Sequence, residues 1–289
     1  MKIHGNWDQD IWMRDPAVLK KDGIWHCFYT HIEKRDVQQG KIRLALGRIR
    51  SRDLVHWSDP EIILSGPEGF SSPGNILEIP EGYLVCLQSY PVRSGELYGS
   101  DECRLWLMKS QDLIRFEKPV QVAPDGCGAK WAKSRRQIDP YLVCKNDTYY
   151  MFYKTEGCIG VMQSSNLRDF GEYADKRPVL APSDLPDGVT AENPCVIRSD
   201  GKYRMFFAPC RPGRGIGTAW SDDLLQWKEI RYLDFPTEDW APGGPTAPAV
   251  IDDREESGDW IMFYHGDTEG VHGGALGMAR SKDLVHWVT

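Results

Sequence analysis

Ser51-Arg52-Asp53-Leu54-Val55-His56-Trp57 is the stretch that decides the fold, because the chain returns to this pattern four more times. Every copy reads Ser-x-(Asp/Asn)-Leu-x-x-(Trp/Phe), and the copies end at Trp57, Phe116, Phe170, Trp227 and Trp287. The closing aromatic residues are therefore 59, 54, 57 and 60 residues apart. Five copies at nearly constant spacing indicate that one structural unit is repeated along the whole chain.

The same two elements precede each copy. A proline marks the start of a first strand, as in Asp15-Pro16 and Asp139-Pro140. A second, apolar strand rich in aromatic residues follows after a turn, as in Tyr149-Tyr150-Met151-Phe152-Tyr153. A unit of three or four short antiparallel strands is typical of a propeller blade, and five blades close a ring. The sequence thus predicts an all-β fold, a five-bladed β-propeller.

The predicted ring takes up the whole chain as one domain. We expect the blades at about residues 8–60, 61–120, 121–180, 181–235 and 236–289. Within the repeat, the Ser and Asp side chains can bond to the backbone of a turn, while the Leu and Trp side chains pack between blades. Little chain follows Trp287, so either the segment Met1–Trp7 completes the last blade or that blade is short.

Composition and charge exclude several classes of protein. The 289 residues carry 42 acidic and 35 basic side chains, and the net charge of −7 argues against a nucleic-acid partner. No apolar run approaches the ~18 residues that a membrane span needs. The amino end lacks an apolar stretch of the signal-peptide type, and the eight cysteines form no Cys-x-x-Cys pair, which favours a cytoplasmic protein with reduced thiols. The oligomeric state is left open.

Function is expected where the repeats differ from one another. The strand starts read Asp15, Ser72, Asp139, Glu192 and Ala247, so acids occur only in blades one, three and four. Because the first strand of a blade lines the central axis, we expect the three acids to converge at one mouth of the channel. A single Asp-Pro pair merely marks a turn, but carboxyl groups that share a site shift each other's pKa, as acid–base catalysis requires. The pattern predicts cleavage of a glycosidic bond.

These residues and repeats resemble the five-bladed propeller glycoside hydrolases, most closely family 43, the arabinofuranosidases, arabinanases and β-xylosidases. The resemblance covers all five blades. It implies that Asp15 is the general base, that Asp139 orients the reacting groups and raises the pKa of the acid, and that Glu192, kept protonated by its neighbours, is the general acid. It also implies that His265 in Phe263-Tyr264-His265-Gly266 stands below the sugar, near an ion in the channel, although a packed strand histidine is the alternative. No cofactor is required by this resemblance, and no metal ligand is predicted.

The hypothesis is therefore a glycosidase that cleaves an arabinofuranoside or xyloside with inversion, and whose partner is a small-molecule or oligosaccharide substrate. Two departures leave alternatives open. Phe70-Ser71-Ser72-Pro73 stands where family 43 usually has an aromatic-Ala-Pro, and Trp12-Met13-Arg14-Asp15-Pro16 is similar to the retaining enzymes that act on fructans and sucrose. Arg135-Arg136 indicates a further alternative, a glycoside phosphorylase. A non-catalytic sugar-binding propeller is the last, and the three intact acids argue against it.

Aromatic and cationic residues on the loops are the candidates for the sugar-binding surface, because aromatic faces stack on sugar rings and Arg forks hold hydroxyls or acids. For each of them, core packing or a surface position is the alternative interpretation. The candidates are Trp12, Phe70, Trp131, Arg135, Arg136 and Trp240. The cationic segment 127–136 could bind an acidic sugar or a phosphate, or it could be a solvated loop.

Overall fold

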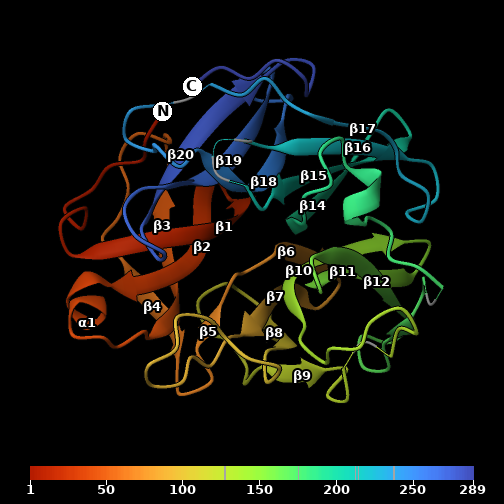
Figure 1. The fold of residues 1–289 in the computed structure, drawn as a ribbon. Coiled ribbons are helices and arrows are strands. Elements are labelled where there is room, and N and C mark those ends of the chain that lie inside the picture. Colours follow the sequence, from red (N-terminus) through yellow and green to blue (C-terminus); the bar gives the residue numbers. More distant parts are fainter. Residues whose placement is uncertain (127, 175, 212, 214, 237) are drawn as a thin grey trace.

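The computed structural model describes all residues except 127, 175, 212, 214 and 237. Its strands form five antiparallel sheets that surround a central axis (Figure 1), so the predicted five-bladed β-propeller is confirmed. The one α-helix among the described residues is α1 (Lys34–Gln38), and Pro182–Asp184 forms a single 3-10 turn. No helix in this part of the chain is long and apolar enough to cross a membrane.

Strands that follow one another in the chain are neighbours in each sheet, because tight turns connect them. Blade one contains β1 (Ile11–Lys21), β2 (Ile24–Glu33), β3 (Leu44–Ser51) and β4 (Glu61–Ser65). Blade two contains β5 (Phe70–Ser71), β6 (Ile76–Ile79), β7 (Gly82–Ser89), β8 (Arg104–Ser110) and β9 (Val120–Val122). Blade three contains β10 (Ile138–Lys145), β11 (Thr148–Thr155), β12 (Cys158–Ser164) and β13 (Gly171–Glu172). Blade four contains β14 (Ala191–Ser199), β15 (Lys202–Pro209), β16 (Gly217–Ser221) and β17 (Lys228–Tyr232). Blade five contains β18 (Pro245–Asp253), β19 (Asp259–Asp267) and β20 (Gly274–Ser281).

The repeated motif builds the turn that ends β3, β8, β12, β16 and β20. In the first copy, Ser51 Oγ accepts a hydrogen bond from the Leu54 backbone N–H at 2.9 Å, and Asp53 Oδ1 accepts one from the His56 backbone N–H at 2.8 Å. These bonds hold Leu54 at a φ of 64°, a left-handed conformation that costs an L-residue free energy. The predicted bonding of Ser and Asp to the turn backbone is thereby confirmed.

The aromatic residue that closes the motif packs edge-on against the second strand of the preceding blade. Ring centroids lie 5.9–6.3 Å apart in the pairs Phe116–Phe28, Trp227–Phe152, Trp287–Phe206 and Trp57–Phe263. The last of these pairs joins blade one to blade five and so closes the ring. Such aromatic pairs contribute about 0.5–1.5 kcal/mol each beyond the area that they bury. The expectation that the motif packs between blades is correct.

A glycine on the third strand leaves room for an aromatic ring on the second strand in four of the blades. In blade five, Tyr264 on β19 lies opposite Gly277 on β20, and a Cβ atom at Gly277 would come within 2.5 Å of the tyrosine ring. The corresponding pairs are Tyr29–Gly47, Tyr153–Gly160 and Phe207–Gly217. Blade two has Leu87 opposite Trp106 instead, with the large side chain on the other strand.

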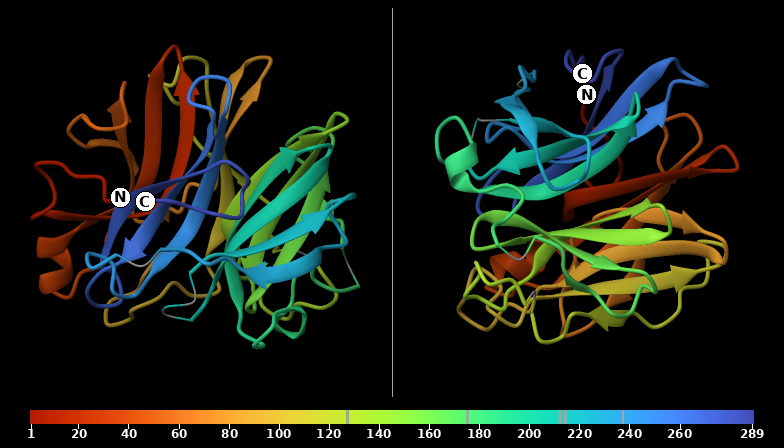
Figure 2. Two further views of the ribbon diagram at one scale, coloured as in Figure 1. Left: turned by 90° about the horizontal axis from the view of Figure 1, so that it is seen from above. Right: turned by 90° about the vertical axis from the view of Figure 1, so that its right-hand side faces the viewer.

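The amino-terminal segment completes the last blade, which decides between the two alternatives left by the sequence. Lys2 bridges to Gly277 on β20, and the Ile3 backbone N–H donates to the Leu276 carbonyl at 2.8 Å. The two ends of the chain lie next to each other in all three views (Figures 1 and 2). First and last residues of the described chain therefore meet in the same blade.

Candidate active site

The central channel is lined by one residue pair from each blade, a residue with positive φ followed by proline. The φ angles of 42° to 53° belong to Asp15, Ser72, Asp139, Asn193 and Ala247. In blades one, three, four and five this position lies within a β-bulge between the first two strands. The structure corrects one assignment here, since Asn193 and not Glu192 is the blade-four equivalent of Asp15 and Asp139. Glu192 pairs with Ala208 one residue earlier, where Arg14 pairs with Thr30 in blade one.

All three predicted acids nevertheless line one cavity of about 580 Å³ at the mouth of the channel. The side chains of Asp15 and Glu192 are 18% and 30% exposed, and Asp139 is buried at 7%. Blades one, three and four each contribute one carboxyl group, and solvent reaches the hollow between them. The arrangement suits a single sugar unit held among the three acids.

Asp15 is held in place by two neighbours. Thr30 Oγ1 donates a hydrogen bond to Asp15 Oδ2 at 2.8 Å, and Ser72 donates its backbone N–H to the same Thr30 hydroxyl at 2.7 Å. His265 is 1% exposed, and its Nδ1 accepts the Asp15 backbone N–H at 3.0 Å. The His265 proton therefore lies on Nε2, which faces Asp267 Oδ1 at 3.3 Å. His265 therefore holds the backbone of Asp15 in place and is not among the residues that line the cavity.

Asp139 is the acid whose pKa is raised. Its backbone N–H donates to Gln88 Oε1 at 2.7 Å, and Ser72 Oγ lies 3.3 Å from its Oδ1. Burial, with the negative charges of Glu192 and Asp15 added to it, outweighs the opposing charge of Lys154 and raises the pKa of Asp139 to about 7. Asp139 is therefore partly protonated at neutral pH.

Glu192 behaves differently from the expectation that its neighbours keep it protonated. Lys154 on β11 donates a hydrogen bond to Glu192 Oε2, and the Lys154 side chain is only 13% exposed. Burial favours the neutral acid, but the charge and hydrogen bond of Lys154 outweigh burial and lower the pKa of Glu192. The expectation was wrong because it rested on the three acids alone and not on this buried lysine.

Most of the predicted sugar-binding residues lie outside the cavity. Phe70 is 5% exposed and packs edge-on against Trp106, and Trp240 stacks on Tyr264 with ring centroids 6.1 Å apart. Three other candidates also make local contacts: Trp131 donates to the Ala174 carbonyl, Trp12 lies near Lys34, and the exposed Arg135 pairs with Asp125. Trp12 and Phe70 lie in strands β1 and β5 and not on loops as expected, and the buried Phe70 ring packs in the core.

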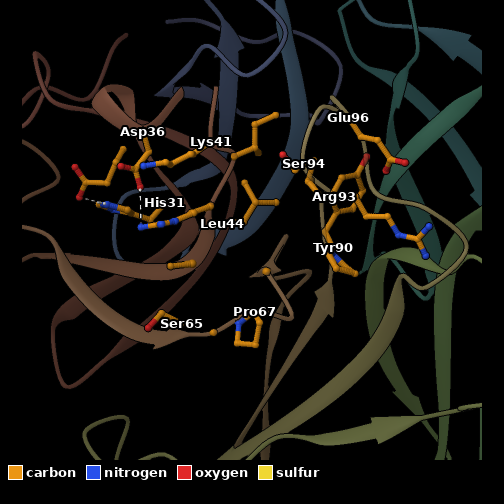
Figure 3. A pocket seen from close by; sticks show the side chains of 18 of the residues that line it. His31, Asp36, Lys41, Leu44, Ser65, Pro67, Tyr90, Arg93, Ser94 and Glu96 are labelled. Carbon is orange, nitrogen blue, oxygen red and sulfur yellow. Dashed lines mark hydrogen bonds and ion pairs between the residues drawn. The ribbon is translucent and has the colours of Figure 1, made fainter. Parts of the chain in front are cut away.

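The cavity is completed by residues that the sequence argument did not single out, apart from Arg136. The lining includes Arg14, Thr30, Gln88, Tyr90, Tyr98, Arg136, Lys154, Asn193 and His272. A second cavity of about 650 Å³ shares Leu44 and Tyr90 with it, and Figure 3 shows His31, Asp36 and Lys41 on one side and Arg93 and Glu96 on the other. The two hollows adjoin, so a substrate larger than one sugar has room beside the acids.

Within the described residues, no group of three or more His, Cys, Asp or Glu side chains is placed to hold a metal ion. The channel ion near His265 stays a prediction.

Fold, cavity and carboxyl groups together define a class, the five-bladed propeller glycoside hydrolases, to which the sequence resemblance also pointed. The chain belongs to the family described as glycosyl hydrolases family 32 N-terminal domain, whose model matches residues 8–175. Family 43, named from the motifs, is represented among similar solved structures by a thermostable family-43 glycoside hydrolase. That structure has a TM-score of 0.64 and 19% identity, over 93% of this chain and 89% of the other. At this identity the likeness concerns the fold alone.

Three further proteins are similar over part or all of the chain. An uncharacterized protein of Mycobacterium tuberculosis is 27% identical over 153 residues, 49% of this chain and 50% of that protein. A probable sucrose-6-phosphate hydrolase of Vibrio cholerae is 28% identical over 190 residues, 61% of this chain and 32% of that protein. An exo-1,5-α-L-arabinanase from a bovine ruminal metagenomic library has a TM-score of 0.66 and 16% identity, with 96% of each chain covered. The matched part thus spans about half or less of the curated relatives' length.

Proposed function

We propose that the protein hydrolyses the glycosidic bond of a furanoside, with Asp15, Asp139 and Glu192 as the reacting carboxyl groups. The observation that carries the proposal is the single cavity that these side chains line from three different blades. Hydrolysis of a glycoside needs a proton donor for the leaving oxygen and a second carboxyl group on the other side of the sugar. A sugar-binding propeller without catalysis would gain nothing from three carboxyl groups that repel each other.

The proton that the reaction needs is shared between two of the acids. Asp139 carries this proton near neutral pH, while Lys154 keeps Glu192 ionised. We assign Glu192 as the donor, because it is the most exposed of the three acids. A leaving-group oxygen that takes the place of Lys154 at Glu192 would remove the ion pair and raise the pKa of Glu192, so that the shared proton moves to it. Lys154 then faces the Asp139 carboxylate that remains.

Asp15 acts at the anomeric carbon, and its mode of action decides the product. A direct attack forms a covalent intermediate and retains the anomeric configuration, whereas activation of a water inverts it. Membership of family 32 and the stretch Trp12-Met13-Arg14-Asp15-Pro16 favour the retaining alternative over the inverting one.

The same family membership makes a fructofuranoside the first substrate to test, since similar proteins of Vibrio cholerae are named probable sucrose-6-phosphate hydrolases. Arabinofuranosides and xylosides, suggested by the likeness of the strand starts to family 43, are the second choice.

The test is a panel of sucrose, sucrose 6-phosphate, and 4-nitrophenyl α-L-arabinofuranoside and β-xyloside, with the anomer of the released sugar read by NMR. We expect turnover of a furanoside and loss of at least a thousandfold in kcat for Asp15→Asn. Glu192→Gln should lose far more activity on an alkyl or sugar leaving group than on 4-nitrophenol, which needs no proton. No turnover of the three furanosides by the folded protein would refute the furanoside assignment, and equal losses on both leaving groups would remove Glu192 from the donor role.

A further inference from the structure

Of the described residues in the cationic segment 127–136, only Arg136 lines the cavity, and its surroundings differ from those of Arg135. Arg135 is 61% exposed and pairs with Asp125 at 3.4 Å on the surface. Arg136 is partly buried, lies in the wall of the catalytic cavity, and donates from Nη2 to the Tyr90 hydroxyl at 3.0 Å. Its guanidinium carbon also lies 5.3 Å from the centroid of the Tyr90 ring. The two adjacent arginines therefore face different environments.

Among the described residues, Arg136 forms hydrogen bonds with Tyr90 and Cys103 but no ion pair with a carboxylate. Lys154 is paired with Glu192, and Arg14 lies 3.7 Å from Asp267. Over the described part of the chain, no carboxylate comes within ion-pair distance of Arg136, and its Nε is buried without an acceptor. Burial raises the pKa of the adjacent Cys103 thiol to about 11, so this thiol is neutral. Asp139 contributes less than a full negative charge at neutral pH, because its pKa is about 7.

An uncompensated, partly buried guanidinium is costly unless something supplies the missing charge. The planar guanidinium of an arginine in a cavity wall suits an oxyanion, such as a phosphate or a carboxylate, better than a neutral hydroxyl.

We propose that Arg136 binds an anionic group carried by the sugar substrate, a phosphate or a carboxylate, and selects anionic over neutral glycosides. This assignment rests on the proposed glycosidase function, and it adds a specificity residue outside the three reacting acids.

The experiment compares kcat/KM for sucrose and sucrose 6-phosphate in the wild type, Arg136→Gln, Arg136→Lys and the matched control Arg135→Gln. We expect the wild type to prefer the phosphorylated sugar at least tenfold and Arg136→Gln to lose at least tenfold of that preference. Arg136→Lys keeps the charge without the fork and should fall in between, and Arg135→Gln should keep the wild-type ratio. An unchanged ratio in Arg136→Gln, with hydrolysis intact, overturns this proposal and leaves the glycosidase function standing.

Binding measurements separate the two proposals if neither sugar is hydrolysed. Calorimetry with fructose 6-phosphate, galacturonate, inorganic phosphate and fructose would be run on the wild type and on Arg136→Gln. Binding of one of the anionic sugars at least tenfold tighter than fructose, lost in Arg136→Gln, supports Arg136 even where the furanosidase function fails, and shows whether phosphate or carboxylate is preferred. Binding of inorganic phosphate alone, or anion binding that Arg136→Gln does not weaken, overturns the assignment.

Discussion

Replacing Asp139 by asparagine should stabilise the folded protein at neutral pH while it abolishes catalysis. The wild-type carboxyl group is 7% exposed and has its pKa raised from 3.8 to about 7. The unfolded chain therefore releases this proton at lower pH than the folded one does. Between these two pH values the unfolded state binds fewer protons, so wild-type stability falls as pH rises. Below about pH 4 both states are protonated and the effect disappears.

The size of the effect follows from the two pKa values. Each pH unit between them corresponds to 1.36 kcal/mol, so the carboxyl group costs the wild type about 4 kcal/mol of unfolding free energy at pH 8 relative to pH 4. Asparagine has no proton to lose and keeps an oxygen for the Ser72 hydroxyl. Any constant cost of the amide NH₂ group shifts the whole curve and leaves its slope unchanged.

The assay is urea unfolding of wild type and Asp139→Asn at half-unit steps from pH 4 to 8. The difference in unfolding free energy should move in favour of the variant by about 4 kcal/mol across this range. Asp10→Asn, at an exposed aspartate, is the control and should show no comparable slope. A difference that stays flat between pH 4 and 8 would refute the argument that Asp139 holds the site proton.

Three further predictions address other parts of the structure. Lys154→Met removes the cation that lowers the pKa of Glu192 and of Asp139. The alkaline limb of the pH profile of kcat/KM should therefore move to higher pH by about one unit or more. An alkaline limb that stays in place would contradict the role of Lys154. Ser221→Ala removes the oxygen that accepts the Leu224 N–H at 2.9 Å and should lower the free energy of urea unfolding by about 1–2 kcal/mol. The control Asp222→Ala, on the surface, should lower it by less than ~0.5 kcal/mol. Equal losses of stability would show that the motif serine does not hold the turn. Gly277→Ala places a methyl group 2.5 Å from the Tyr264 ring and should lower the melting temperature by several degrees or prevent folding. Gly171→Ala is the control, because its methyl group meets no atom within 4 Å and should leave the melting temperature unchanged.

The fold could be predicted from the sequence because the signal is local and repeated. A serine and an aspartate that bond to the next few backbone N–H groups specify a turn wherever they occur, as at Ser51 and Asp53. Five copies of one turn then required five similar sheets. The meeting of Asp15, Asp139 and Glu192 could be inferred from the same symmetry, since residues near equivalent positions of a ring lie near one axis.

The finer features of the site depend on contacts between blades, which no single repeat encodes. Lys154 follows a run of aromatic strand residues and has no signature of its own, yet it reaches Glu192 on the next blade. The sequence did not show that Asn193, and not Glu192, occupies the channel position of blade four, because both residues lie within two positions of Pro194. The aromatic candidates failed for another reason: Phe70 and Trp240 have the same side-chain chemistry in a core as in a sugar subsite, so their type alone could not separate the two.

The five channel positions have a consequence for how such a molecule can change. In each blade one residue of the channel has the same left-handed backbone conformation, whether that residue is Asp, Ser, Asn or Ala. The backbone geometry is thus independent of the side chain at this position, and Ala247 is the one position of the five without a polar side chain. A new polar group could be introduced there by a single substitution, while Ser72 already supports Asp139.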